Sequence, residues 1–381
     1  MHANPFSDAE LARRVAAVRL AMAAREVDIA LLSSPENIFY LIGLDHWGYF
    51  APHVLIVPEV GDLVLITRQM EHVVVRNQVR NARFIGHSDS ESAADVVVTH
   101  LAGTCGGRTL GIEAGSSGMS LAMGTQIKTG IETAGWVDIT GMVDTLRLVK
   151  SVEEQGFMRR SARAADAGTQ AAIEAIHEGA AEADVAAECL AAMTRAGGGP
   201  PGFGPFLRPA WRMAEEHTTW GDGTHREAVF LEVAGCVARY NAPMGRLVNI
   251  GGISDADADA AELSKAAFEA TLQALKPGRR ARDVYDGWQA VVDAAGMPEY
   301  RRHHCGYLVG IGFPPSWTGG PRVLGLRHDS DLEMQEGMTF HLMSWFTETG
   351  RGNYFVSNTV LLTGSGAELL NQTGMGPFVR S

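Results

Sequence analysis

Residues 151–179 read SVEEQGFMRRSARAADAGTQAAIEAIHEG, and this stretch divides the sequence into two parts. It is rich in alanine and charged residues at helical spacing, so it predicts a long helix, and a second such helix is expected over residues 184–195. Beyond a Gly/Pro-rich loop at 197–209, the apolar runs 228–238 and 246–250 are typical of strands. The stretch therefore opens a region in which two helices precede two strands.

The same order of elements recurs towards the C-terminus. The later helices and strands are expected at residues 257–275, 283–295, 338–345 and 354–363. We interpret residues 151–381 as one domain with a coarse internal duplication of helix, helix, strand and strand.

Upstream of this region the pattern changes. Ser7 followed by Glu10 indicates a capped helix N-terminus, and the helix should run to about Arg25. Short strand-like runs then alternate with helical or turn segments, at residues 27–32, 54–57, 63–67 and 108–113. This alternation predicts an α/β domain over residues 1–150.

Composition excludes several classes of function. Acidic residues number 44 against 32 basic ones, a net charge of −12, which disfavours nucleic acid and anionic membrane surfaces as partners. No apolar run approaches the roughly 20 residues of a membrane span. The 4 cysteines are far apart and form no CxxC pair, which favours a reducing compartment. We expect a soluble cytoplasmic protein.

Three short motifs add a family resemblance. They are LKPG at 275–278 before a helix, HHCGY at 303–307 at a strand edge and EGMTF at 336–340 opening a strand. With the duplication, they make the chain resemble the creatinase/prolidase/methionine aminopeptidase superfamily along essentially its whole length. The resemblance implies an N-terminal creatinase-type α/β domain, then an α+β "pita-bread" domain of two helical layers around curved antiparallel sheets, with one active site in the central cleft.

Peptidases of this superfamily hold two metal ions with Asp, Asp, His, Glu and Glu. The resemblance places these five positions on Glu232, Pro243, Tyr307, Met343 and Asn358. Because hard divalent ions prefer carboxylate oxygens and imidazole nitrogens, this set predicts no dinuclear metal site and no cofactor. A rebuilt mononuclear site made from His217, Glu232, His304 and His341 is an alternative.

Without the metal ligands, the chain resembles the metal-independent branch, which contains creatinase and the ectoine hydrolases. The stretches similar to ectoine hydrolases are HTTW at 217–220, FLEVAGC at 230–236, RY at 239–240, GYLVG at 306–310, PPSW at 314–317 and GMTFH at 337–341. Two recognition residues differ, because His304 replaces an Arg and Asn358 replaces a Glu. Both charged side chains that would bind ectoine are therefore missing.

The resemblance also suggests an assembly. DHWGYF at 45–50 is similar to a loop that, in these dimeric enzymes, reaches over the partner's cleft. It implies a homodimer in which Trp47 and Tyr49 help to cover the small-molecule site of the other subunit.

Glu232 and His217 are the main candidates for chemistry. Glu232 lies in the middle of an apolar strand, where a charge is costly unless it is functional; it is either a nucleophile or general base, or a carboxylate that stabilises the sheet. His217 is either a general acid or base, or a histidine packed on Trp220. The Tyr307 hydroxyl could stabilise an oxyanion or hold the substrate, or it could belong to a buried aromatic residue.

Further residues are candidates for substrate binding: His304, His341, Asn358, Trp220, Tyr240, Trp47 and Tyr49. The first hypothesis is a metal-independent hydrolase that cleaves a C–N bond in a small cyclic amidine, guanidino or amide compound. A lyase that abstracts a proton in the same cleft, and a non-catalytic binder of a small molecule or protein, are the alternatives. An Xaa-Pro metallopeptidase is disfavoured.

Overall fold

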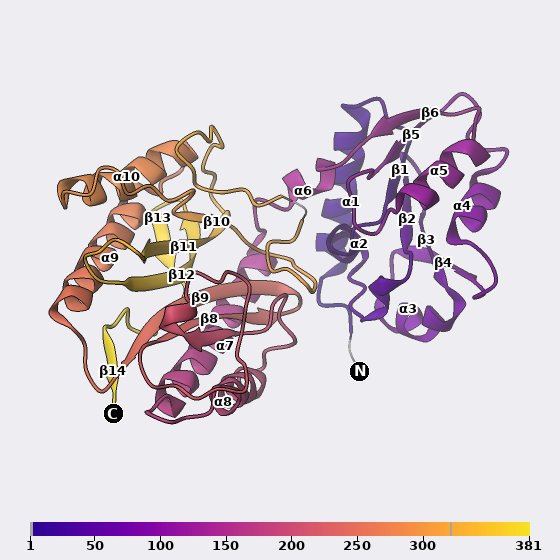
Figure 1. The fold of residues 1–381 in the computed structure, drawn as a ribbon. Helices are drawn as coiled ribbons and strands as arrows, with labels where there is room; N and C mark the ends of the chain where they lie inside the picture. The colour runs from indigo at the N-terminus through magenta and orange to yellow at the C-terminus, as the bar shows by residue number, and fades with distance from the viewer. Residues whose placement is uncertain (1–2, 321) are drawn as a thin grey trace. The chain divides into compact units, whose positions relative to one another are not determined.

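The computed structural model describes residues 3–320 and 322–381. The chain divides into two compact units, Met1–Arg147 and Leu148–Ser381 (Figure 1). In the described part of the chain, no helix combines the length and the apolar character that crossing a bilayer requires. All four cysteines are buried free thiols.

The first unit is a mixed sheet with helices. Its strands are β1 (Ile29–Leu32), β2 (Val54–Pro58), β3 (Leu63–Arg68), β4 (Ala82–His87), β5 (Thr109–Ile112) and β6 (Gly135–Asp138), and they lie in the order β4-β3-β2-β1-β5-β6. Its α-helices are α1 (Asp8–Ala23), α2 (Pro35–Ile42), α3 (His72–Gln78), α4 (Ala93–Leu101), α5 (Leu121–Gly130) and α6 (Met142–Leu146). A buried cluster between the sheet and helices α4 and α5 forms its core, as the apolar spacing of those segments requires.

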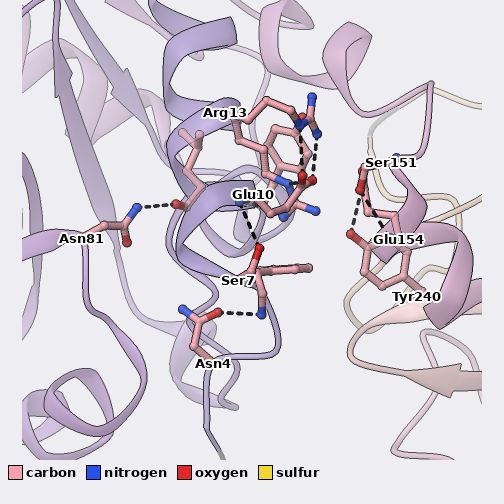
Figure 2. Close-up of polar contacts among 12 residues, drawn as sticks. Asn4, Ser7, Glu10, Arg13, Asn81, Ser151, Glu154 and Tyr240 are labelled. Atoms are coloured by element: carbon pink, nitrogen blue, oxygen red, sulfur yellow. Dashed lines mark hydrogen bonds and ion pairs between the residues drawn. The ribbon is translucent and has the colours of Figure 1, made fainter.

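The first helix begins as its sequence predicts. The Ser7 hydroxyl accepts a hydrogen bond from the Glu10 backbone N–H at 3.1 Å (Figure 2), which satisfies one of the free donors of the first turn. The Glu10 carboxylate also pairs with Arg13 and with the buried Arg14. The helix ends at Ala23, two residues before the expected Arg25.

The second unit repeats one arrangement of elements. Helices α7 (Val152–Ala175) and α8 (Glu182–Arg195) precede strands β7 (Phe206–Pro209), β8 (Val229–Val237) and β9 (Tyr240–Ile250). Helices α9 (Asp255–Ala274) and α10 (Ala281–Ala294) precede strands β10 (Gly306–Leu308), β11 (Thr339–Phe346) and β12 (Tyr354–Thr363). In Figure 1, α7 lies beside β8 and β9 with α8 packed against it, and α9 lies beside β11 and β12 with α10 packed against it. The expected duplication is confirmed.

One sheet runs through this unit in the order β10-β11-β12-β9-β8-β7. Two short strands extend it, with β13 (Gly366–Leu369) pairing with β12 and β14 (Phe378–Arg380) pairing with β9. Strands β8, β9, β11 and β12 are buried along nearly their whole length, which fits their apolar sequences. Helix pairs on a curved sheet are the architecture that the resemblance implied.

Helix α7 is fixed to the sheet at two places. At its N-terminus Ser151 and Glu154 form a capping box, and the Tyr240 hydroxyl donates to the Glu154 carboxylate at 2.7 Å (Figure 2). Further along, the helix passes so close to β8 that a Cβ at Gly235 would overlap the Ser161 carbonyl oxygen. Only glycine therefore fits at this position of the strand.

Candidate active site

A cavity of about 370 Å³ lies in the second unit. Its aromatic lining consists of Phe203, Phe206, Tyr307, Trp317 and Trp345, and its ionisable lining of Arg208, Glu216, His217, Glu232, Arg302, His303, His304 and Arg327. Strands β7, β8, β10 and β11 supply part of this lining, and the loops between elements supply the rest. The size suits one small molecule.

One row of cross-strand neighbours passes through the site, and we call it the Glu232 row. Glu232 on β8 pairs with Phe206 on β7 and with Gly245 on β9. Gly245 pairs with Ser357 on β12, and Ser357 pairs with Met343 on β11. Because directly opposed residues of paired strands point to the same face of a sheet, all five belong to the face that lines the cavity.

Gly245 leaves room for the ring of Phe355, which a Cβ at this position would overlap. On the same face of the sheet, the Glu232 carboxylate Oε1 lies 3.7 Å from His341 Nε2. This separation is an electrostatic contact rather than a hydrogen bond.

Glu232 is the buried carboxyl group of the cavity. Only 8% of the residue is exposed, and no described residue donates a hydrogen bond to its carboxylate. Burial raises the pKa of Glu232 from 4.5 to about 8; the positive charge of Arg208 opposes this rise and the negative charge of Glu216 adds to it. The group is therefore mostly protonated at pH 7.

Arg208 influences Glu232 without hydrogen-bonding to it. Its guanidinium lies over the Phe230 ring, 4.3 Å from the centroid, and donates to the carbonyl groups of Arg212, Met213 and Thr218. Its donors are therefore directed at the loop that contains His217. This cation holds the loop in place and supplies a remote positive charge to the cavity.

A chain of hydrogen bonds lies behind one wall of the cavity. The Trp317 indole N–H donates to the Tyr307 hydroxyl at 2.9 Å, and the same hydroxyl is 2.9 Å from His341 Nδ1. His341 Nε2 is in turn 2.7 Å from the Ser357 hydroxyl. Burial raises the pKa of Tyr307 well above 10 and lowers the pKa of His341 to about 3, so both side chains are neutral around pH 7.

The structure changes the role expected for His341. Its side chain is fully buried and does not line the cavity, so it is not a direct substrate contact. Both ring nitrogens lie within hydrogen-bond distance of hydroxyl groups. His341 therefore acts on the cavity only through Tyr307 and, electrostatically, through Glu232.

His217 lines the cavity from an exposed loop. Its backbone has φ +62°, a left-handed conformation that costs energy for a residue other than glycine. The ring is close to the rings of Phe203 and Phe206, with centroids 5.8 and 6.0 Å away. Trp220, expected beside it, instead packs against the buried core around α7 and α8 and is not part of the cavity lining.

His304 lines the cavity in a half-buried position. Burial, together with the nearby His303, lowers the pKa of His304 to about 3, so its ring is neutral. Its Nδ1 atom is buried and has no hydrogen-bond partner among the described residues. A neutral imidazole cannot replace the ionic grip of an arginine on a carboxylate.

Asn358 is on the wrong face of its strand for the predicted role. It pairs with Leu342, whereas Ser357 belongs to the Glu232 row. The Asn358 side chain accepts a hydrogen bond from the buried Arg246 at 2.9 Å and does not line the cavity. Because neighbouring residues of a strand point to opposite faces, the β12 residue on the cavity face is Ser357, one position before the one that we assigned; it is fully buried behind the cavity lining.

Tyr240 is also outside the cavity lining. It is fully buried, its ring stacks on Phe157 at 5.3 Å, and its hydroxyl is bonded to Glu154 (Figure 2). These contacts give it a role in the packing of α7 rather than in substrate binding.

Trp47 and Tyr49 belong to the first unit. Trp47 is 64% exposed, and the nearby Phe50 is 82% exposed. The Tyr49 hydroxyl donates to the Leu44 carbonyl at 2.9 Å, and its ring packs against His46 and His53. Tyr49 thus shapes the loop, while Trp47 and Phe50 present an apolar surface.

The residues at the metal positions of the superfamily do not fit a metal centre. Glu232 is the one carboxylate in the Glu232 row, and Met343 and Ser357 offer a thioether and a neutral hydroxyl. Pro243 has no ligating group, and the Tyr307 hydroxyl is already bound to Trp317. Within the described residues, no group of three or more His, Cys, Asp or Glu side chains is arranged to hold a metal ion.

Three residues of the site were missed or undervalued in the sequence. Ser357 was overlooked because of the one-residue offset, and Trp317 was noted only as part of the PPSW stretch at 314–317. Arg302 carried no signal in the sequence, yet it lines the cavity, with its guanidinium carbon 4.7 Å from the centroid of the Trp345 ring. No described residue forms a hydrogen bond or ion pair with the Arg302 guanidinium, so it is available to a ligand.

Comparisons with known proteins agree with this architecture. An uncharacterised hydrolase/peptidase of Sinorhizobium fredii is 27% identical over 386 residues, with 97% of each chain covered. The ectoine hydrolase of Halomonas elongata is 27% identical over 403 residues, with 99% of this chain and 98% of the relative covered. The crystal structure of a prolidase from Thermococcus sibiricus has a TM-score of 0.84 at 20% identity, covering 97% of this chain and 99% of that one. The pita-bread fold is thereby confirmed.

Family matches account for both units. Residues 14–149 match the creatinase/prolidase N-terminal domain. Residues 156–364 match metallopeptidase family M24. The chain therefore belongs to family M24 and carries a creatinase-type domain in front of its pita-bread domain.

Proposed function

We propose that this protein is a metal-independent hydrolase that opens a C–N bond in a small cyclic amidine, guanidino or amide compound. The observation that carries the proposal is the buried Glu232 carboxyl in a small aromatic cavity, in a row whose partners Met343 and Ser357 are not metal ligands. Similarity to an ectoine hydrolase over nearly the whole chain supports the same class of reaction.

The charges of the cavity favour a cationic group next to Glu232. A neutral carboxyl with no hydrogen-bond donor gains most from a ligand that brings positive charge, because the cation lowers the pKa of Glu232 and pairs with the resulting carboxylate. The rings of Phe206, Tyr307 and Trp317 add surfaces that attract a planar cation such as an amidinium.

Arg302 can bind an anionic group of the substrate. Its guanidinium carbon lies 4.7 Å from the centroid of the Trp345 ring, and it lines the same cavity as Glu232. A ligand with a cationic group at Glu232 and a carboxylate at Arg302 would contact both residues. Arg302 would then take over the carboxylate contact that the neutral His304 cannot make.

The chemistry follows from these placements. In its ionised form Glu232 accepts a proton from water as the water oxygen bonds to the electrophilic carbon of the substrate. The Tyr307 hydroxyl donates a hydrogen bond to the heteroatom on which electron density accumulates. His217 gives a proton to the leaving nitrogen as the C–N bond breaks, and it is reprotonated from solvent because its loop is exposed.

The test is turnover by metal-stripped protein on a panel of amidines, guanidines, ectoines and cyclic amino acids. We expect hydrolysis of at least one compound, unaffected by EDTA, and a loss of about 10²-fold or more in Glu232→Gln. Glu178→Gln, an exposed carboxylate in the same unit, is the matched control and should leave turnover unchanged. Activity that requires added divalent metal, or full activity in Glu232→Gln, would refute the proposal.

Heavy-oxygen water separates hydrolysis from the other reactions. A hydrolase incorporates the label into its product, whereas a lyase that removes a proton does not. Thermal stabilisation by a ligand without turnover of any compound would instead indicate a binding protein.

The assembly and location are part of the same proposal. We propose a homodimer in which the exposed Trp47 and Phe50 are covered by the partner, as the loop at 45–50 suggests. The four buried free thiols suit a reducing, cytoplasmic environment.

A further inference from the structure

We infer that His341 is a positioning residue: it donates from Nδ1 to the Tyr307 oxygen and accepts at Nε2 from Ser357, which leaves the Tyr307 hydrogen for the cavity. This role in catalysis rests on the proposed function. The hydrogen-bond arrangement itself rests only on counting donors and acceptors in the described contacts.

The Tyr307 oxygen has two hydrogen-bond partners, of which Trp317 is the first. An indole N–H can only donate, so its contact of 2.9 Å occupies one acceptor position of the Tyr307 oxygen. The second partner of this oxygen is His341 Nδ1, also at 2.9 Å. Whether Tyr307 donates to Nδ1 or accepts from it depends on which nitrogen of His341 carries the hydrogen.

Ser357 decides between the two tautomers. Its hydroxyl is fully buried, and His341 Nε2 at 2.7 Å is its one hydrogen-bond partner among the described residues. If Nε2 carried a hydrogen, the serine hydrogen would be left without an acceptor, which is unfavourable in a buried site. If Nε2 is bare, it accepts from Ser357 and both groups are satisfied.

The hydrogen of the neutral imidazole is then on Nδ1 and points at Tyr307. With both acceptor positions filled by Trp317 and His341, Tyr307 must direct its own hydrogen elsewhere, and its side chain lines the cavity. In the opposite tautomer, Tyr307 would donate to Nδ1 and present no hydrogen to a substrate. Ser357 and His341 thus make Tyr307 a donor towards the cavity.

Glu232 opposes this arrangement when it is ionised. Its Oε1 lies 3.7 Å from Nε2, so a negative charge there attracts a hydrogen to that nitrogen. The Ser357 hydroxyl counteracts this attraction. Removing it should therefore move the imidazole hydrogen from Nδ1 to Nε2.

The test is the ¹⁵N NMR spectrum of the full-length protein with labelled histidine, in which protonated and bare ring nitrogens have well-separated shifts. His341→Gln assigns the signals. We expect a protonated Nδ1 and a bare Nε2 in the wild type. Near pH 9, where Glu232 is ionised, we expect the reverse in Ser357→Ala. Thr359→Val is the control, because it removes a buried hydroxyl of the same strand that donates to the Pro243 carbonyl and not to His341. It should leave the wild-type tautomer in place.

A wild-type protein with hydrogen on Nε2, or an unchanged tautomer in folded Ser357→Ala near pH 9, would overturn the inference. The wild-type spectrum decides even if a variant fails to fold, and it needs no substrate, so it is independent of the proposed function. Once a substrate is known, Ser357→Ala should lower kcat about 10-fold with KM unchanged. It should add no further loss in a Tyr307→Phe background, because the two residues act on one step.

Discussion

Replacing Glu232 with glutamine should change how the stability of the second unit depends on pH. In the folded protein the pKa of Glu232 is about 8, against 4.5 for an ordinary glutamate. Between these values the folded chain retains a proton that the unfolded chain has lost, so the free energy of unfolding falls by about 1.4 kcal/mol per pH unit. Glutamine has a similar shape and no such proton.

The magnitude follows from the width of that pH window. The contribution of the protonated carboxyl is complete below pH 4.5 and is lost as the pH rises through about 8, a total of roughly 5 kcal/mol. Between pH 5 and pH 8 the variant should gain roughly 4 kcal/mol relative to the wild type. For a domain of this size that is a relative shift in Tm of roughly 10 °C.

The assay is thermal or urea unfolding of both proteins from pH 5 to pH 9, with the transition of the second unit followed separately. The glutamine amide changes the free energy of unfolding by an amount that does not depend on pH. The informative quantity is therefore how the difference in unfolding free energy between the variant and the wild type changes with pH. Other titrating groups, including the buried histidines, contribute to both chains and cancel. Glu178→Gln should run parallel to the wild type. Parallel curves for Glu232→Gln as well would show that Glu232 titrates normally and would remove the main electrostatic argument for the site.

Three other outcomes are expected. Asn358→Ala should lower the Tm of the second unit by roughly 4–8 °C, since a hydrogen bond to the buried Arg246 is worth about 2 kcal/mol; an unchanged Tm in thermal unfolding would contradict this structural role. Arg302→Gln should raise KM about 10- to 100-fold for a carboxylate-bearing substrate and leave the KM of its uncharged analogue unchanged. Arg301→Gln, which is outside the cavity lining and paired with Asp293, should alter neither; equal effects of both variants would argue against the Arg302 contact. Trp47→Ala combined with Phe50→Ala should yield monomers in sedimentation velocity at micromolar concentration, and a persistent dimer would place the interface elsewhere.

Much of the architecture was predictable because it depends on local patterns. Ser7 and Glu10 indicate the capped start of α1, and the duplication appears as a repeated order of apolar spacings. Glu232 was also identifiable, since burying a carboxylate in an apolar strand is energetically costly unless the group is paired or functional.

The arrangement around Glu232 was harder to predict because it depends on strand register. An offset of one residue moves a side chain to the opposite face of a sheet, which is why Asn358 was chosen in place of Ser357. Tyr307, Trp317 and His341 meet through β10, β11 and a loop, and no sequence spacing encodes those contacts. Arg302 gave no signal, since an arginine before a strand is most often a solvated surface residue.

The residue changes in the Glu232 row and the high pKa of Glu232 are physically connected. In a metal centre, divalent cations keep neighbouring carboxylates ionised, because the positive charge compensates for the loss of water. With Met343 and Ser357 in the row, no second carboxylate and no ligand set remain, so Glu232 is buried without a cation. A lone buried carboxyl is stable in its protonated form, and added positive charge beside it favours its ionisation. A cationic substrate supplies that charge at the moment of binding, which would generate the base only when there is a bond to cleave.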